Sequence, residues 1–406
     1  MQAVKLVIHG SYWDSQIYQG RLYLFGRDGS VRTVNWDRLI DRFNFEKSLR
    51  LAAECAFRRS SYLYGSAWDL FFGDPDVKAL IKKKFADLSA IDLEVDPKFL
   101  EDCTVGNQNN PFPFPHSDII IYSKKMFSVG LSGVWQGSCG KKNKYPISTR
   151  PKKQWDCPTY SVAAAYGTLA LAAGDDGLWE ADAGIYNRYE YFNDKAEEPK
   201  QIYRHGCDSC EWMYHSVYGS SYTKGGFLAE FDRNQTEAYS RNIERSFSKA
   251  VDDKEIFNTE GYSWGTRDKI YLANRSDIFV ARYRPFSSEG HIKYIDRFEI
   301  GKQQGDFVSG GVATFGTVLE YENAIVVITS NGESITIPGE PVRWRVFPGS
   351  RQYQNHLHVV YDDSIVINSF NNDYFVSQDE KIFGSRAITE TGVSFRRGPN
   401  IDEVAF

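Results

Sequence analysis

The side chains best suited to metal chemistry lie in one short stretch, His205-Gly206-Cys207-Asp208-Ser209-Cys210. Two thiolates with two residues between them can share a tetrahedral zinc ion, and His205 could supply a third ligand. A fourth ligand would have to come from Cys139, Cys157 or His215, and there is no second Cys-x-x-Cys pair. Cysteine is also a common small buried residue. The sequence therefore favours a plain thiol pair, and it predicts no metal site and no cofactor.

A second chemical candidate is the basic stretch Lys141–Lys153, KKNKYPISTRPKK, which Trp155 follows closely. Basic residues interleaved with aromatic ones can hold phosphates and stack a nucleic-acid base. The same composition also suits a solvated loop or a surface that binds an acidic protein. The residues that could contact a partner here are Lys141, Lys142, Lys144, Tyr145, Lys152, Lys153 and Trp155.

Carboxylates and histidines are the remaining candidates for catalysis. Asp175, Asp176, Glu180 and Asp182 could include the acid and base of a glycosidase. However, the first two fall in a predicted turn, where aspartate serves backbone geometry. The pattern His356-Leu357-His358 suits a strand with both rings on one face, or a metal pair. No GxSxG, P-loop or GxGxxG sequence stands in a suitable context, so the sequence predicts no catalytic residue.

Short strands are the elements that would position these residues. The stretch Tyr160–Asp182 contains the apolar runs Ser161–Ala165 and Thr168–Ala173, a break at Gly174–Gly177, and a third run from Leu178. Asp-Gly between short apolar runs predicts a tight turn, because glycine accepts the positive φ that hairpins require. We interpret the stretch as the middle of an antiparallel meander.

Similar units recur along the chain, with turns predicted near residues 28, 124, 176, 225, 275, 331 and 363. From 124 to 331 the spacings are 52, 49, 50 and 56 residues, and the last step is 32. A period of about 50 residues in an all-β sequence is typical of a propeller, in which each blade is a four-stranded meander. We predict an all-β fold, a seven-bladed β-propeller spanning residues 1–406 as a single domain. Two β-sandwiches, or six or eight blades, are alternatives.

Both ends of this array have a predicted role. Propellers often close by pairing a strand from one terminus with the last blade, which removes an open edge. Val4–His9 is a short apolar run that could form such a strand. We therefore expect Val4–His9 to pair within the C-terminal blade.

One segment, residues 37–115, interrupts the strand pattern. Asn44–Arg59 places its apolar residues on one face with the 3.6-residue period of an amphipathic helix. A second helix is predicted from Asp74-Pro75, because an aspartate cap followed by proline is a typical helix start. The Pro-rich stretch Asn107–Pro115 predicts an irregular connector. We expect residues 37–115 to be a helical and irregular insertion within the propeller.

The insertion is rich in aromatic residues, which interfaces favour as anchors. The same side chains could instead seal the insertion onto the rim of the propeller. The residues concerned are Phe57, Tyr62, Tyr64, Trp68, Phe71 and Phe72.

Composition limits the class of protein. Hydrophobic residues make up 42% and charged residues 25%, which is typical of a folded chain with a large core. The net charge of −5 gives no general attraction to nucleic acid or to an anionic membrane. There is no signal-peptide pattern and no apolar run of about 18 residues. Six cysteines are too few for a disulfide framework. The expected location is the cytoplasm, with reduced thiols.

In its repeat period the chain resembles β-propellers of the WD40 and kelch type, over nearly its whole length outside 37–115. Trp-Asp dipeptides occur at Trp13, Trp36, Trp68 and Trp155. No Gly-His pair precedes them at the spacing of WD40 repeats, and the tandem glycines of kelch repeats are missing. The resemblance is therefore one of architecture. WD40-like propellers are mostly interaction platforms, so the resemblance implies a protein partner.

The leading hypothesis is a non-catalytic scaffold or regulatory subunit that binds another protein, without nucleic acid or membrane. One alternative is a hydrolase or lyase that uses central-channel acids and histidines. Another is a nucleic-acid adaptor that works through residues 141–153.

Overall fold

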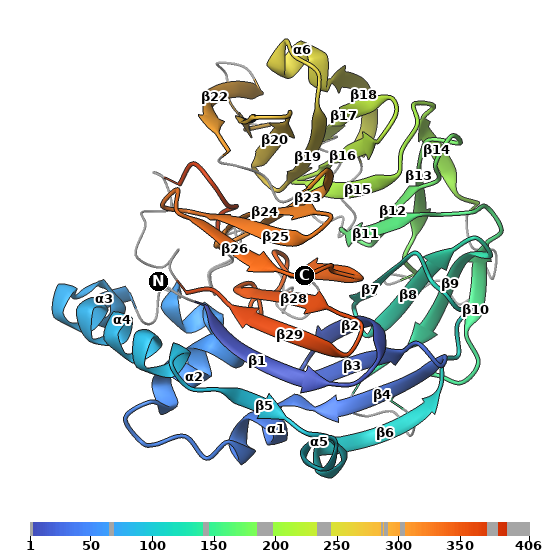
Figure 1. Ribbon diagram of the computed structural model, residues 1–406. Helices are drawn as coiled ribbons and strands as arrows, with labels where there is room; N and C mark the ends of the chain where they lie inside the picture. Colours follow the sequence, from blue (N-terminus) through green and yellow to red (C-terminus); the bar gives the residue numbers. More distant parts are fainter. Residues whose placement is uncertain are drawn as a thin grey trace. The chain divides into compact units, whose positions relative to one another are not determined.

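The computed structural model describes residues 3–64, 69–140, 146–184, 198–233, 245–285, 287, 291–300, 305–371 and 381–387. Its strands form seven sheets, each one blade of a seven-bladed β-propeller, as the repeat period predicted (Figure 1). Contacts divide the described residues into two compact units. The first lies within Met1–Asn110, Gly140–Pro146 and Gln303–Asn400, and the second within Pro111–Cys139 and Ile147–Lys302.

The first unit contains three blades. Blade 1 consists of β2 (Tyr12–Tyr18), β3 (Arg21–Gly26), β4 (Ser30–Asn35) and β6 (Thr104–Asn109). Blade 6 consists of β23 (Phe307–Ala313), β24 (Gly316–Tyr321), β25 (Ala324–Thr329) and β26 (Ser334–Pro338). Blade 7, the closing blade, consists of β27 (Arg343–Val346), β28 (His356–Val360), β29 (Ser364–Ser369), β1 (Val4–His9) and β5 (Leu93–Val95).

The closing blade joins strands from both ends of the described chain. β1 runs antiparallel to β29, with Val4 opposite Ser369 and His9 opposite Ser364. The expectation that Val4–His9 pairs within the last blade is therefore confirmed. β5 adds a fifth strand parallel to β1, with Leu6 opposite Leu93. This strand covers the edge of β1 that would otherwise lie open.

The second unit contains the other four blades. Blade 2 consists of β7 (Asp118–Tyr122), β8 (Lys125–Gly130), β9 (Gly133–Ser138) and β10 (Lys152–Trp155). Blade 3 consists of β11 (Ser161–Ala165), β12 (Thr168–Ala172), β13 (Leu178–Asp182) and β14 (Lys200–Tyr203). Blade 4 consists of β15 (Ser209–Met213), β16 (Ser216–Ser221), β17 (Gly225–Arg233) and β18 (Arg245–Asp252). Blade 5 consists of β19 (Tyr262–Thr266), β20 (Lys269–Ala273), β21 (Asp277–Tyr283) and β22 (Ile292–Glu299). The predicted meander of Tyr160–Asp182 is the first three strands of blade 3.

Each predicted turn falls in a different blade, but the seven turns are not equivalent. Those near 28, 176, 225, 275 and 363 join the second and third strands of their blades. The turn near 124 joins the first and second strands of blade 2, and that near 331 joins the third and fourth strands of blade 6. This difference accounts for the short last step, from residue 331 to residue 363.

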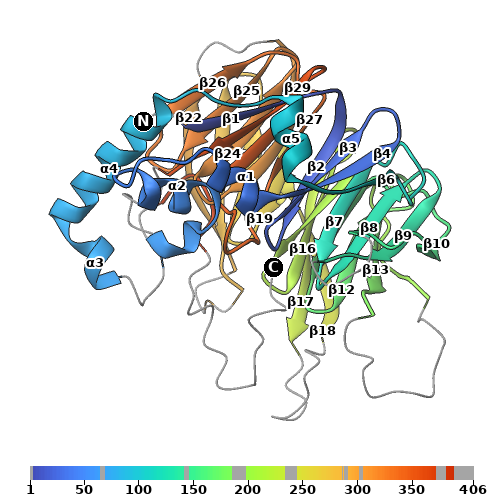
Figure 2. The same ribbon diagram turned by 90° about the horizontal axis from the view of Figure 1, so that it is seen from below.

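Most of the helices lie between β4 and β6 and form what we call the helical segment, which lies beside β1 and β5 (Figures 1 and 2). Its elements are α1 (Trp36–Arg42), α2 (Arg50–Phe57), the 3-10 helix η1 (Ser60–Leu63), α3 (Asp69–Gly73), α4 (Pro75–Ser89) and α5 (Pro97–Cys103). A further helix, α6 (Asp253–Phe257), follows β18 in the second unit. None of the described helices is long and apolar enough to span a bilayer.

The start of α4 is as predicted, because the Asp74 side chain accepts hydrogen bonds from the backbone N–H groups of Asp76 and Val77. The prediction of a helix from Asn44 is wrong for its first six residues. Asn44 has a φ of +46°, outside the right-handed helical region, and α2 begins only at Arg50. The predicted irregular connector also starts too early, since its first three residues belong to β6. β6 pairs with β4 along one edge, and its alternate residues are exposed, so it lacks an apolar pattern.

Candidate functional site

The aromatic residues proposed as anchors in the helical segment have different environments. Phe57, Tyr64 and Phe72 are buried in the hydrophobic core of the first unit. Tyr62 is half-buried, and the Arg59 guanidinium lies 5.2 Å from its ring. Trp68 lies outside the described residues. The aromatic side chain that the segment presents to solvent is that of Phe71 on α3.

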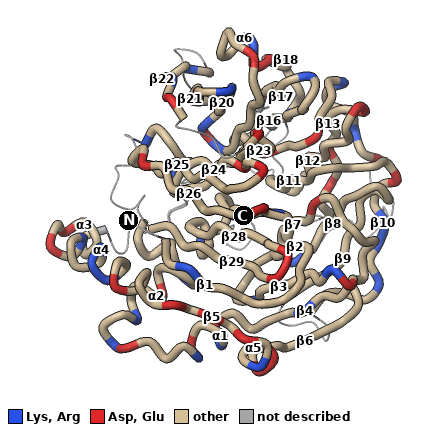
Figure 3. Tube along the Cα trace, viewed as in Figure 1, with Lys and Arg blue, Asp and Glu red and all other residues tan. Residues whose placement is uncertain are grey.

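The surface of the helical segment carries charges of both signs (Figure 3). Asp74 and Asp76 are exposed at the start of α4, and Lys82 and Lys83 are exposed two turns later. Leu70, beside Phe71, is 95% exposed. The segment therefore presents apolar residues among mixed charges.

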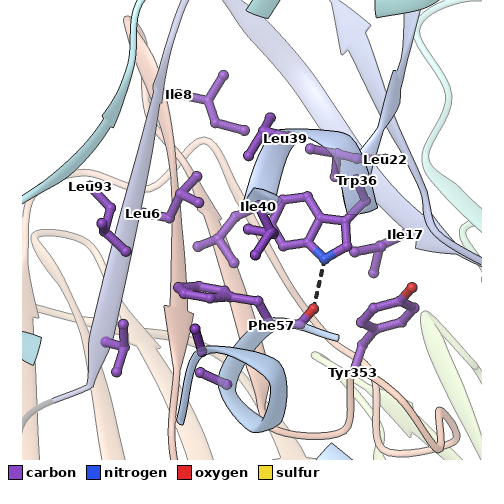
Figure 4. Close-up of a cluster of buried hydrophobic side chains, with 14 of the residues drawn as sticks. Leu6, Ile8, Ile17, Leu22, Trp36, Leu39, Ile40, Phe57, Leu93 and Tyr353 are labelled. Carbon is purple, nitrogen blue, oxygen red and sulfur yellow. Dashed lines mark hydrogen bonds between the residues drawn. The ribbon is translucent and has the colours of Figure 1, made fainter. Parts of the chain in front are cut away.

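The end of α2 is bound to the rest of the first unit through its carbonyl groups. Trp36 Nε1 donates to the Phe57 carbonyl at 2.6 Å (Figure 4). The Ala56 carbonyl accepts from Asn355 Nδ2 at 3.1 Å, His356 Nε2 at 2.9 Å and Ser369 Oγ at 2.8 Å. A helix leaves its last carbonyls without partners inside the helix. Here, side chains of the closing blade supply donors, so the helical segment and the closing blade share one core.

The basic stretch is described only in part, because Lys141, Lys142, Lys144 and Tyr145 lie outside the described residues. Lys152, Lys153 and Trp155 belong to β10, the last strand of blade 2. Lys153 forms an ion pair with Asp156, and its ammonium lies 5.6 Å from the centre of the Trp135 ring. The rings of Trp155 and Trp179 are 4.8 Å apart, which links blades 2 and 3.

Three large apolar side chains are exposed at one end of the blades of the second unit. In a four-stranded meander, the turn between the second and third strands and the entry to the first strand lie at the same end. Leu131, in such a turn of blade 2, is 75% exposed; Tyr160, at the entry to blade 3, is 42% exposed; Tyr222, in such a turn of blade 4, is 61% exposed. We call these three residues the apolar rim.

Local contacts hold the rim in place. The Tyr160 ring packs on Gly174, where an added Cβ would lie 2.7 Å from the ring. The Tyr222 backbone N–H donates to Asp208 Oδ2 at 3.0 Å, and its ring lies 5.1 Å from that of Tyr262. Lys224 joins the turn of blade 4 to that of blade 3 through a 3.0 Å ion pair with Asp175. Tyr160 and Tyr222 are therefore held against turns of blades 3 and 4 that an ion pair links.

A carboxylate pair on the first strands of the blades was missed by sequence reasoning. Asp118 on β7 accepts from Ser161 Oγ at 3.3 Å and from the Val162 N–H at 3.0 Å, both on β11. Glu211 lies on β15, and its side chain is exposed. Desolvation by the surrounding protein, and to a smaller extent the charge of Asp118, raise the pKa of Glu211 to about 7. The only signal in the sequence is an acidic residue between Cys210 and Trp212, which are both buried.

The cysteine pair lies in the core between blades 3 and 4. Cys207 donates to the Ser209 carbonyl at 3.3 Å, and Cys210 donates to the Ala170 carbonyl at 3.4 Å. Burial raises the pKa of both thiols, which favours the protonated form over the thiolate that a metal requires. His205 stacks on Tyr203 at 5.9 Å. Within the described ranges, no three His, Cys, Asp or Glu side chains are grouped as metal ligands.

Two of the four carboxylates considered for a glycosidase are held in ion pairs with basic side chains. Asp175 and Asp176 occupy the turn between β12 and β13, where Asp175 pairs with Lys224. Glu180 instead forms an ion pair with Arg245 of blade 4. The interpretation of the two aspartates as turn residues is confirmed.

No family model matches the chain, and no curated protein matches it. Similar solved structures include the Neurospora crassa Pan2 WD40 domain, at 8% identity, with 89% of each chain covered and a TM-score of 0.46. Another is a "putative 6-phosphogluconolactonase" from Bacteroides fragilis, at 11% identity, covering 70% of this chain and 88% of that one, with a TM-score of 0.44. The AfRom2 CNH domain is 13% identical, with 63% of this chain and 94% of that one covered and a TM-score of 0.33. These similarities carry no functional assignment.

Proposed function

We propose that the chain is a non-catalytic β-propeller scaffold or regulatory subunit that binds a protein partner through the apolar rim. The supporting observation is the exposure of Leu131, Tyr160 and Tyr222 at the same end of three consecutive blades. Aromatic side chains on rigid supports give large contact areas at low entropic cost, which is why interfaces favour them. The proposal treats residues 1–406 as one propeller domain with 37–115 as an insertion.

The described part of the basic stretch extends this surface. Trp155 ends β10 opposite Val134, close to the turn that carries Leu131. Lys152 and Lys153 on the same strand are exposed. A partner with an apolar anchor and an acidic flank would match an apolar rim bordered by these lysines. Phe71 on α3 is the alternative contact site in the helical segment.

Charge reversal at the rim tests this proposal. Tyr160→Asp and Tyr222→Asp are compared with Leu70→Asp, which alters a more exposed apolar residue on α3. The affinity-tagged full chain is purified from its native cells, and the co-purified proteins are quantified by mass spectrometry. We expect each rim variant to lose a specific partner at least about tenfold, the effect of about 1.4 kcal/mol of binding free energy. A cooperative urea unfolding transition in each variant would show that the variant is folded.

The control separates the two surfaces. Loss of the partner in Leu70→Asp, with retention in both rim variants, would move the binding site to the helical segment. Retention of every co-purified protein in all three variants would contradict the scaffold proposal.

Glu211 favours a second candidate function, a hydrolase or lyase. A carboxyl group with a pKa near 7 is present in both protonation states at neutral pH, as general acid–base catalysis requires. The test is turnover of a panel of glycosides, esters and uronides by the purified chain. Glu211→Gln should abolish any turnover found, whereas Asp175→Asn, at an exposed turn, should leave it unchanged. Turnover that persists in Glu211→Gln would exclude this site as the source.

A further inference from the structure

Two fully buried histidines, His356 and His358, lie side by side on β28 of the closing blade. Their ring centroids are 5.7 Å apart. His356 Nε2 donates to the Ala56 carbonyl in the last turn of α2, and His358 Nδ1 lies 2.9 Å from Ser15 Oγ on β2. Among the described residues, His356 Nδ1 and His358 Nε2 have no hydrogen-bond partner. A proton added to His356 Nδ1 would therefore create a buried N–H with no acceptor.

Aromatic rings surround the pair. His356 faces Trp36, Phe57 and Tyr353 at centroid distances of 6.0, 6.3 and 5.5 Å. His358 faces Phe347 at 4.8 Å. Such an environment solvates a neutral imidazole better than an imidazolium, because it offers few acceptors to a buried cation.

The charged side chains near the two histidines are paired with opposite charges, and the other titratable side chains nearby are neutral. Asp14 on β2 is paired with Arg343 and Arg345 of β27. The guanidinium of Arg58, which directly follows α2, binds the carboxylates of Asp37 and Asp41 on α1 and of Glu54 on α2. Burial raises the pKa of the Cys55 thiol to about 12 and raises that of the Tyr353 hydroxyl, so both stay protonated. The described residues of β29, Ser364–Ser369, include no titratable side chain.

We propose that His356 and His358 form an acid-sensitive latch that holds the end of α2 against the closing blade and releases it when they take up protons. Burial lowers the pKa of His356 to about 4, and burial and the neighbouring imidazole lower that of His358 well below its usual range. A released histidine titrates near 6.5. The docked state is therefore favoured above pH 6.5 and loses its advantage as the pH falls below that value.

Release of α2 has a specific chemical reporter. Cys55 lies on α2 and Cys103 at the end of α5, and both thiols are fully buried. Cys139, Cys207 and Cys210 are buried in the second unit and provide an internal reference. 4,4′-Dithiodipyridine labels thiols at acidic as well as neutral pH. The full chain is labelled at pH 7.5 and pH 5, and each site is quantified by peptide mass spectrometry against urea-unfolded protein at the same pH.

The latch predicts that labelling of Cys55 rises at least about tenfold from pH 7.5 to pH 5, with little change at Cys207 and Cys210. In the double variant His356→Gln/His358→Asn, the amides place hydrogen-bonding groups near the original Nε2 and Nδ1 positions and cannot titrate. Cys55 labelling should then be independent of pH. His291→Gln, at a half-exposed histidine of the second unit, should retain the wild-type response.

Three results would overturn the latch: equal Cys55 labelling at both pH values in the wild type, a simultaneous rise at all the buried cysteines, or an unchanged response in the double variant. If the double variant does not fold, the wild-type comparison between Cys55 and the reference cysteines still decides the matter.

Discussion

Replacing Leu6 with alanine should strongly destabilise the first unit. Leu6 is fully buried in the middle of β1, opposite Ile367 of β29 and Leu93 of β5, and it contributes to the core shown in Figure 4. Truncating such a leucine costs about 2–5 kcal/mol, because apolar burial is lost and the surrounding core relaxes only in part. A domain is stable by about 5–15 kcal/mol, so the loss is a large part of the total.

The matched control is Lys5→Ala, one residue earlier on the same strand. Its side chain is exposed, and such substitutions change stability by less than about 0.5 kcal/mol. Urea unfolding, followed by circular dichroism and tryptophan fluorescence, measures both variants against the wild type. Equal unfolding midpoints for Leu6→Ala and Lys5→Ala would refute the insertion of β1 into the closing blade. Deletion of residues 1–10 extends the test, and unchanged thermal unfolding would contradict strand closure.

Three further predictions concern the helical segment and Glu211. Replacing residues 44–88 by a Gly/Ser linker should unfold the first unit, because it removes Phe57 from the core and the Ala56 carbonyl from its donors; a native circular dichroism spectrum would contradict this. Asn355→Ala should lower the free energy of unfolding by about 1–3 kcal/mol, since buried carbonyls lose a donor, and urea titration measures the change. Glu211 has a raised pKa, so its contribution to stability is full below the unfolded value of 4.5 and is lost as the pH rises through about 7. Glu211→Gln should remove that pH dependence from urea unfolding, and an unchanged pH profile would exclude the shift.

The blade count could be predicted because it depends on local chemistry. Turns such as Gly174–Gly177 are encoded by a few residues with a fixed backbone requirement, and one falls in every blade. The pairing of β1 was predictable for a different reason, since an open propeller has unpaired edges at its ends. The boundaries of α2 were not, because Asn44 adopts a left-handed conformation that the apolar period does not reveal.

The candidate sites were harder to predict because they depend on neighbours far apart in the sequence. Ala56 and His356 are 300 residues apart in the chain, yet one hydrogen bond joins them. Asp118 and Glu211 lie on different blades, yet the charge of Asp118 adds to desolvation by the surrounding protein in raising the pKa of Glu211. The sequence also gives no means of distinguishing the buried Phe72 from the exposed Phe71. Residue types were visible in each case, but their spatial relations were not.

The aromatic residues of the chain fall into two groups, one expected to act on stability and the other on partner binding. Phe57 and Phe72 pack in the core of the first unit and are not available to a partner in that state. Substitutions at these two phenylalanines should therefore act mainly on folding. Tyr160 and Tyr222 are 42% and 61% exposed, so substitutions there should act mainly on binding. A variant of Phe72 that loses the partner while keeping wild-type stability would break this division, and would assign recognition to an opened form of the helical segment.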